Sequence, residues 1–135
     1  MKFKSTQIVT LSCALIILLV TAHLYLLDGL TGGLFLRMLG EDDTVYADGY
    51  SDAAYRQIRR GSTATEVRNL LGEPFETFGM IEDRRADDGW WYGRPESDAT
   101  GWSYTITPNS SHYRKRIIVF REGHVVDKVN KIYVD

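Results

Sequence analysis

The hydrophobic and polar positions divide the chain into three parts. Residues 8–27 contain no charged side chain, and a helix of this length spans about 30 Å, the thickness of a bilayer's hydrocarbon core. Residues 28–49 are interrupted by glycines and include an acidic run. From residue 50 onward, stretches with helical spacing are followed by strand-like stretches. We therefore predict a transmembrane helix within residues 1–27, a juxtamembrane linker at 28–49 and a folded domain at 50–135.

The apolar N-terminal stretch fits two interpretations, a cleaved signal peptide and an uncleaved membrane anchor. Signal cleavage needs small residues one and three positions before the cut, and residues 22–27 are mostly bulky. We therefore favour an anchor. Lys2 and Lys4 precede it and Asp28 follows it, which places the N-terminus in the cytoplasm and the domain outside. A lipoprotein would carry its lipidated cysteine after the apolar run, whereas most of the run follows Cys13.

The beginning of the domain has the spacing and capping residues of two short helices. Residues 51–60 begin with Ser51, a good N-cap, and place apolar side chains three and four residues apart. Thr63 and Glu66 have the spacing of a capping box, which predicts a second helix after Thr63. Glycines can end both helices, and a proline follows the second. The residues of this motif are Gly61, Thr63, Glu66, Val67, Leu71, Gly72 and Pro74.

The rest of the domain predicts an antiparallel sheet. Apolar and aromatic residues gather at 75–81, 90–92, 113–121 and 124–134. Residues 122–123 have the composition of a two-residue hairpin turn, which places Phe120 opposite Val125. The next pair would then be Val119 and Val126. We expect an α+β fold in which two short helices pack on a three- to four-stranded antiparallel sheet, preceded by the transmembrane helix.

The helical part of the domain resembles the SmpA/OmlA family, the BamE-like domains. The resemblance rests on the string Tyr55-x-x-Ile58-x-x-Gly61-Ser62-Thr63-x-x-Glu66-Val67-x-x-Leu70-Leu71-Gly72-Glu73-Pro74. Phe78-Gly79-Met80, Trp90-x-Tyr92 and the strand 117–120 followed by Gly123 are similar to the sheet half of that family. The chain differs from it in having an apparent anchor in place of a lipidation motif.

The resemblance implies a fold and a class of function. Family members are small envelope proteins without catalysis, and the best-known one is an outer-membrane lipoprotein accessory to the machine that inserts β-barrel proteins. Their fold is two helices on a three-stranded antiparallel sheet, and β-lactamase inhibitor proteins share it. The resemblance therefore implies a non-enzymatic protein that acts through protein–protein contacts in outer-membrane or cell-envelope assembly.

Composition and charge exclude several other classes. The net charge is −2, and the part after the span is more acidic, which argues against nucleic-acid binding. The single cysteine lies in the predicted span, which excludes a disulfide framework and an external cysteine nucleophile. Outside the span only His112 and His124 remain, and two histidines do not make a zinc site. We expect no enzyme activity, no cofactor and no metal; a small hydrolase or metalloenzyme is the least favoured alternative.

Aromatic residues suggest where a partner would bind. Trp90 and Trp91 are consecutive on a predicted strand, so their rings point to opposite faces. One ring can enter the core beneath the helices, and the other must be covered or exposed. Because Trp, Tyr and Arg dominate binding hot spots, an aromatic contact surface is one interpretation. The other is that a flap around Trp102 seals the face. The predicted partner-binding residues are Trp90, Trp91, Tyr92, Arg94 and Trp102.

These observations lead to one leading hypothesis and one runner-up. The leading hypothesis is a membrane-anchored interaction domain in the bacterial cell envelope, held at the inner membrane with its domain in the periplasm and bound to an envelope protein. An outer-membrane lipoprotein or a protein secreted after signal cleavage are the alternative locations. The runner-up function is a periplasmic module that binds a peptide or lipid on its sheet.

Overall fold

The computed structural model describes residues 5–25, 28–29, 32, 34, 38, 42–83, 89–94, 96–108 and 112–133 of the 135-residue chain. The chain forms two compact units, Met1–Gly40 and Glu41–Asp135. In the first unit, helix α1 (Ser5–Tyr25) contains an uncharged stretch, Gln7–Leu24, long and apolar enough to cross a membrane. Such a helix is compatible with a membrane anchor and with a signal sequence. Lys2 and Lys4, on which the predicted orientation depends, lie outside the described residues.

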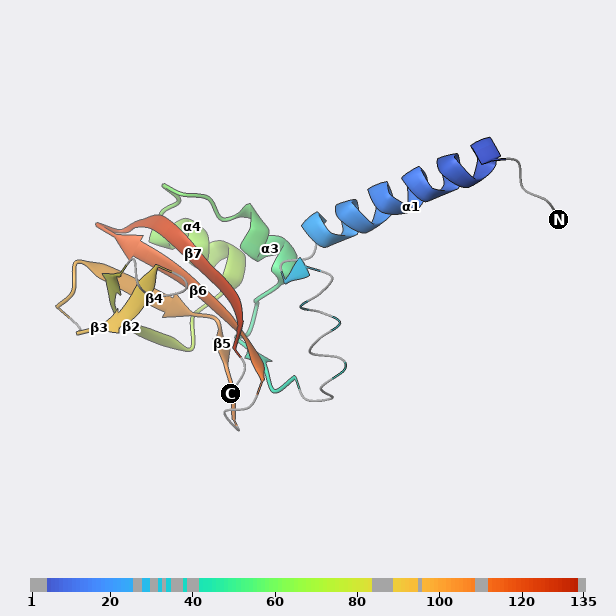
Figure 1. Cartoon of the computed structure of the whole chain (residues 1–135). Coiled ribbons are helices and arrows are strands. Elements are labelled where there is room, and N and C mark those ends of the chain that lie inside the picture. The colour runs from blue at the N-terminus through green and yellow to red at the C-terminus, as the bar shows by residue number, and fades with distance from the viewer. Residues whose placement is uncertain are drawn as a thin grey trace. The chain divides into compact units, whose positions relative to one another are not determined.

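The second unit is an α+β domain with an antiparallel sheet, as predicted in outline (Figure 1). The strands of the main sheet are β2 (Glu76–Glu82), β3 (Trp90–Gly93), β4 (Ala99–Ser103), β6 (Tyr113–Arg121) and β7 (His124–Tyr133). They lie in the order β3-β2-β4-β6-β7. Two further short strands, β1 (Val45–Tyr46) and β5 (Thr105–Ile106), pair with each other. Helices α3 (Asp52–Gln57) and α4 (Ala64–Leu71) lie on one face of the sheet (Figure 1).

The size of the sheet and the number of helices differ from the prediction. The described part of the chain has a five-stranded sheet because residues 99–103, which were not among the predicted strands, form the central strand β4 between β2 and β6. This segment, Ala-Thr-Gly-Trp-Ser, mixes the strand formers Thr and Trp with the poor strand formers Ala and Gly, so its pairing with two neighbouring strands decides its conformation. In the first unit, Gly29, Gly32, Leu34 and Met38 are also helical, where a linker was expected.

The predicted helix caps are present. Ser51 Oγ accepts a hydrogen bond from the Ala54 N–H at the beginning of α3. At α4, the Glu66 N–H donates to Thr63 Oγ1 at 3.3 Å and the Thr63 N–H donates to Glu66 Oε2 at 2.8 Å, which completes the capping box. Helix α3 ends at Gln57, three residues earlier than expected, because Ile58 is extended and its side chain is buried.

The terminal hairpin turns where it was predicted, but its register changes after one pair. Glu122 and Gly123 have positive φ angles of 52° and 77°, as a type I′ turn requires. Phe120 faces Val125, as expected. A β-bulge follows, so Val119 faces Asp127 instead of Val126. The extra residue thus directs the Asp127 side chain to the same face as Val119.

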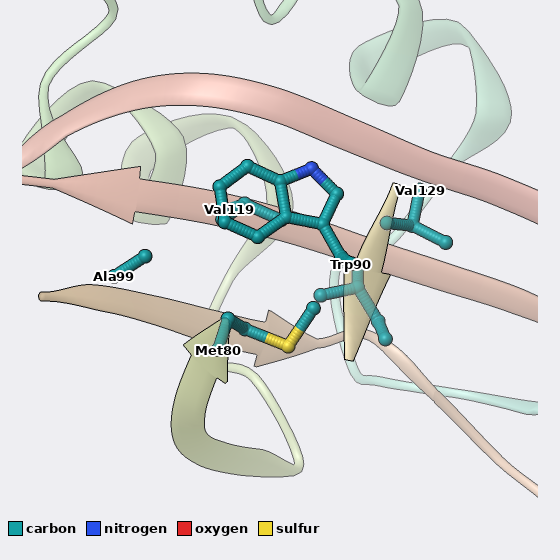
Figure 2. Close-up of a cluster of buried hydrophobic side chains, with 6 residues drawn as sticks. Met80, Trp90, Ala99, Val119 and Val129 are labelled. Atoms are coloured by element: carbon teal, nitrogen blue, oxygen red, sulfur yellow. The ribbon is translucent and has the colours of Figure 1, made fainter. Parts of the chain in front are cut away.

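The sheet curls, and each of its faces carries a separate part of the core. The face covered by the helices includes Ile118, Phe120 and Trp102 with the buried helix residues Val67 and Leu71. The opposite, concave face holds its own cluster (Figure 2), which consists of Met80, Trp90, Ala99, Ile117, Val119 and Val129. At one end of this face the two edge strands are linked by a hydrogen bond, which the Trp90 indole of β3 donates to the Asp127 carboxylate of β7.

The domain begins before residue 50. The Asp43 N–H donates to the His112 carbonyl oxygen, the Ala47 N–H donates to the Tyr104 carbonyl oxygen, and β1 pairs with β5. The second half of the predicted linker, from Asp42 on, is therefore part of the folded unit.

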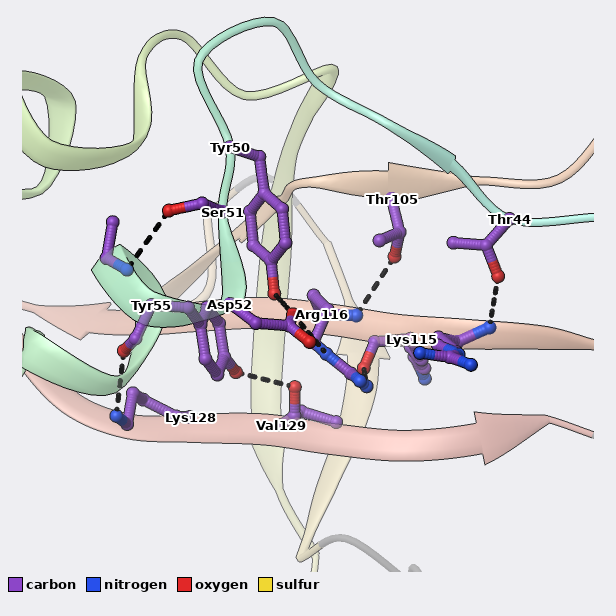
Figure 3. A network of polar contacts seen from close by, with 12 residues as sticks. Thr44, Tyr50, Ser51, Asp52, Tyr55, Thr105, Lys115, Arg116, Lys128 and Val129 are labelled. Carbon is purple, nitrogen blue, oxygen red and sulfur yellow. Dashed lines mark hydrogen bonds and ion pairs between the residues drawn. The ribbon is translucent and has the colours of Figure 1, made fainter. Parts of the chain in front are cut away.

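The segment that begins at Asp42 and helix α3 together cover the fully buried side chain of Arg116 (Figure 3). Arg116 makes an ion pair with Asp52 at 3.9 Å, and Asp52 accepts a hydrogen bond from the Tyr50 hydroxyl at 2.8 Å. Nearby, the Tyr55 hydroxyl donates to the Val129 carbonyl oxygen at 2.8 Å. Burial raises the pKa of both tyrosines far above the ordinary phenol value. These contacts attach α3 to the sheet through buried polar groups.

Candidate interaction surface

The three consecutive aromatic residues of β3 have different environments. Trp90 belongs to the concave cluster, where its ring lies near Val119 and Val129 and only 7% of the residue is exposed (Figure 2). Its Nε1–H donates to Asp127 Oδ2 at 2.9 Å. One tryptophan was expected beneath the helices, but Trp90 is buried on the opposite face. The reason is the curl of the sheet, which brings β7 over the ring.

Trp91 is the exposed member of the pair. It is 64% exposed and lies opposite Ile81 of β2, which is 48% exposed. Strand alternation puts both side chains on the face that carries the helices, at the end of the sheet that the helices leave open. We call these two residues the Trp91–Ile81 patch. A tryptophan and an isoleucine side by side on an edge strand and its neighbour form an apolar surface suited to a partner.

Tyr92 points to the concave face and belongs to another surface. Its ring contacts Phe78 at 4.8 Å between centroids, and Lys115 Nζ lies 4.8 Å from its ring centroid. Tyr92, Tyr113 and Lys115 line a hollow of about 200 Å³ together with polar residues of β4 and β5. Burial raises the pKa of Tyr113, and the neighbouring Tyr92 and Tyr133 raise it further. Trp91 and Tyr92 therefore cannot contact one flat surface together.

Trp102 is a core residue and forms no flap. It lies on the central strand β4 and is 8% exposed. Its ring contacts Phe120 at 4.4 Å, and the guanidinium carbon of Arg68 from α4 lies 4.5 Å above it. The expectation that Trp102 contacts a partner or seals an aromatic face is thus replaced by a structural role under α4. Of the five predicted contact residues, Trp91, Tyr92 and Arg94 are exposed, and Trp90 and Trp102 are buried.

Arg94 begins the connection that crosses β2. Strands β3 and β4 lie on either side of β2 and both run antiparallel to it, so the chain must cross β2 between residues 94 and 98. It crosses at Gly79, where a Cβ atom would overlap the carbonyl oxygen of Arg94. Gly79 and Ile81 share a face of β2, so this crossing lies beside the Trp91–Ile81 patch. Only a glycine allows the crossing at this position, which is a feature that sequence reasoning missed.

A polar hollow of about 420 Å³ lies where β3 and β7 approach each other. Arg121 makes ion pairs with Asp98 at 3.2 Å and with Glu82 at 3.6 Å. Arg60 pairs with Asp127 at 3.6 Å. The charged residues near this hollow therefore form two groups. One is Arg121 with Glu82 and Asp98, and the other is Arg60 with Asp127.

Among the described residues, no group of three or more His, Cys, Asp or Glu side chains is arranged to hold a metal ion. His112 is half-buried, and His124 is exposed with Nδ1 at 3.0 Å from the Glu122 carbonyl oxygen. No known family matches the sequence, and neither the curated proteins nor the solved structures include a match. The resemblance to the SmpA/OmlA family accordingly stays a prediction from the sequence motif.

Proposed function

We propose that this protein is a non-enzymatic, membrane-anchored interaction protein of the bacterial cell envelope, whose domain binds a protein partner through the Trp91–Ile81 patch. Two features support the anchor: the apolar helix α1 and the absence of charge along residues 8–27. The lysines before the helix and the motif similarity to SmpA/OmlA support an inner-membrane anchor, a periplasmic domain and a role in outer-membrane or cell-envelope assembly.

The observation that carries the proposal is the exposure of Trp91. A tryptophan side chain buries roughly 150–250 Å² when it is covered, and at 64% exposed most of that area is still available to a partner. At about 25 cal/mol per Å², covering roughly 150 Å² would contribute about 4 kcal/mol before the cost of association is counted. Ile81 lies opposite it and enlarges the apolar surface, and exposed tryptophans are enriched among binding hot spots.

Photo-crosslinking in the native host tests this proposal. A photoreactive phenylalanine analogue at position 91 should form an adduct with one defined protein, and the same analogue at position 133, where Tyr133 is also exposed, should not. Trp91→Ala in the full-length protein should reduce co-purification of that protein by about tenfold or more. Equal adducts from both positions, or unchanged co-purification, would contradict the proposal.

A second candidate function rests on the concave face. The hollow lined by Tyr92, Tyr113 and Lys115 supports a module that binds a peptide or lipid there. Tyr92→Ala distinguishes the two functions, since Tyr92 and Trp91 point to opposite faces of β3. If Tyr92→Ala abolishes ligand capture and Trp91→Ala does not, the concave face is the binding surface.

A further inference from the structure

We propose that the hollow of about 200 Å³ lined by Tyr92, Tyr113 and Lys115, which we call the Tyr–Lys hollow, is a binding site for a small zwitterion. The ligand carries one anionic group, a phosphate or a carboxylate, which binds at Lys115. It also carries one ammonium group, which binds at Glu76. The inference rests on the second candidate function, because it names the ligand of the concave face, and it is independent of the Trp91–Ile81 patch.

Three strands bring the charged and aromatic residues of the Tyr–Lys hollow to one face of the sheet. Glu76 begins β2 and shares a face of that strand with Met80 of the concave cluster. Lys115 shares a face of β6 with Ile117 of the same cluster, and Tyr92 of β3 lies opposite Met80. Side chains that are distant in the sequence thus meet at the end of the concave face where β2 begins.

The size of the Tyr–Lys hollow limits the ligand to a small group. Its volume is about 200 Å³, whereas pockets for drug-sized ligands measure about 300–1,000 Å³. Hydroxyl groups of Ser103, Thr105 and Thr107 also line it. A polar space of this size suits a single amino acid or the headgroup of a lipid, and it is too small to enclose a peptide of several residues.

Both signs of charge line the Tyr–Lys hollow without neutralising each other. Glu76 and Lys115 are both wall residues. Glu76 is exposed, and in the part of the chain that the structure describes it makes no ion pair with Lys115 or with any other residue. The Lys115 ammonium instead lies 4.8 Å from the centroid of the Tyr92 ring. A carboxylate and an ammonium placed in this way are complementary to a ligand that carries the opposite pair of charges.

The tyrosines add a hydrogen-bond donor and aromatic surface. Burial raises the pKa of Tyr113, so its hydroxyl stays protonated and can donate to an anion. Tyr113 lies two residues before Lys115 on the same face of β6, which places donor and cation on one wall. A ligand ammonium is in turn attracted to the faces of tyrosine rings. The walls therefore provide favourable contacts for both ends of a zwitterion.

A ligand of a single charge fits the Tyr–Lys hollow less well. An anion alone would be attracted by Lys115 but repelled by the unpaired carboxylate of Glu76, and a cation alone would meet the reverse situation. The zwitterion satisfies both side chains at once, which predicts selectivity for ligands that carry both groups.

A titration of the isotope-labelled full-length protein in a non-ionic detergent tests the proposal. Phosphoethanolamine should cause saturable changes in amide chemical shifts around the Tyr–Lys hollow. Inorganic phosphate and ethanolamine, which carry one charge each, should bind about tenfold or more weakly. Glycine identifies the source of the ligand: binding at least as tight as that of phosphoethanolamine indicates a free amino acid, and weaker binding indicates a phosphorylated headgroup. Both results support the proposal.

Single substitutions assign the two charges. Lys115→Gln and Glu76→Gln should each weaken phosphoethanolamine binding by about tenfold or more, whereas Glu76→Gln should not weaken the binding of inorganic phosphate. Lys131→Gln is the matched control and should change nothing, because Lys131 lies opposite Lys115 on β7 but is not among the described residues that line the hollow. If Lys115→Gln does not fold, Glu76→Gln decides by itself, since Glu76 is exposed.

Three results would overturn the proposal. They are the absence of saturable shifts with both phosphoethanolamine and glycine, binding of inorganic phosphate as tight as that of the zwitterions, and equal losses in Lys115→Gln and Lys131→Gln. The capture test with Tyr92→Ala separates this failure from failure of the second candidate function. If Tyr92→Ala abolishes capture of a peptide or lipid although no zwitterion binds, that function stands and the zwitterion site is wrong.

Discussion

The neighbouring tryptophans of β3 allow a matched test of the structure. Trp90 is 7% exposed within the concave cluster, and Trp91 is 64% exposed. Trp90→Ala removes a core aromatic ring and the indole hydrogen bond to Asp127, so the free energy of unfolding should fall by about 3–5 kcal/mol. Trp91→Ala removes a ring with little packing, and the free energy of unfolding should change by less than about 0.5 kcal/mol.

Trp90→Phe separates the packing of the ring from its hydrogen bond. Phenylalanine keeps part of the apolar volume and has no N–H donor, so the expected loss is about 1–3 kcal/mol, smaller than for alanine. Asp127 would keep its other contacts in this variant, the ion pair with Arg60 and the hydrogen bond from the Lys128 N–H. The Trp90→Phe loss should therefore lie between those of Trp91→Ala and Trp90→Ala.

Urea unfolding of the isolated domain, residues 41–135, measures these differences, because this unit is compact and has its own core. Far-ultraviolet circular dichroism is the appropriate signal, since the substitutions change the fluorescence itself. Equal losses for Trp90→Ala and Trp91→Ala would show that both rings are structural. A loss of less than about 1 kcal/mol for Trp90→Ala would show that the concave face is not packed as described.

Four further predictions follow from single features. Gly79→Ala should destabilise the domain by about 3 kcal/mol or more, because the new Cβ atom would overlap the crossing backbone. Gly89→Ala should cost only about 1–2 kcal/mol, because Gly89 has open space around it and only its φ of 77° disfavours alanine. Thermal unfolding of the two variants compares these losses. Thr63→Ala should cost about 1 kcal/mol in urea unfolding and Thr63→Ser much less, because serine keeps the capping oxygen. Burial raises the pKa of Tyr55, so the folded state holds the phenol proton more tightly than the unfolded state. The free energy of unfolding should therefore be unaffected by this group below about pH 10 and should fall above it by up to about 1.4 kcal/mol per pH unit. In Tyr55→Phe this fall should be smaller. The intact mass of the native protein should include residues 8–27, and a mature chain that begins after them would contradict the anchor.

Local features of the fold could be predicted from the sequence, because short-range chemistry determines them. A capping box needs only a threonine and a glutamate three residues apart, and Thr63 and Glu66 make it. The two-residue turn at Glu122 and Gly123 requires positive φ angles, which a glycine signals. The apolar helix α1 follows from its composition alone.

Pairing between strands that are distant in the sequence determined the other features of the fold, because no local sequence signal encodes this pairing. Residues 99–103 become the central strand only because β2 and β6 lie on either side of them. The bulge in β7 turns Asp127 toward the concave face, and the curl of the sheet then brings Trp90 to it.

In the candidate surface, too, some features follow from the local sequence and others depend on the tertiary structure. The alternation of side chains along a strand predicted that Trp90 and Trp91 would face opposite ways, and they do. Which ring is buried, and against what, depends on the curvature of the whole sheet. Trp102 was misjudged for the same reason, since only its place on the central strand puts it under α4. Sequence by itself thus determined the elements and the direction of their side chains, and the tertiary structure decided which of those directions lead into the core, because burial depends on neighbours that are distant in the chain.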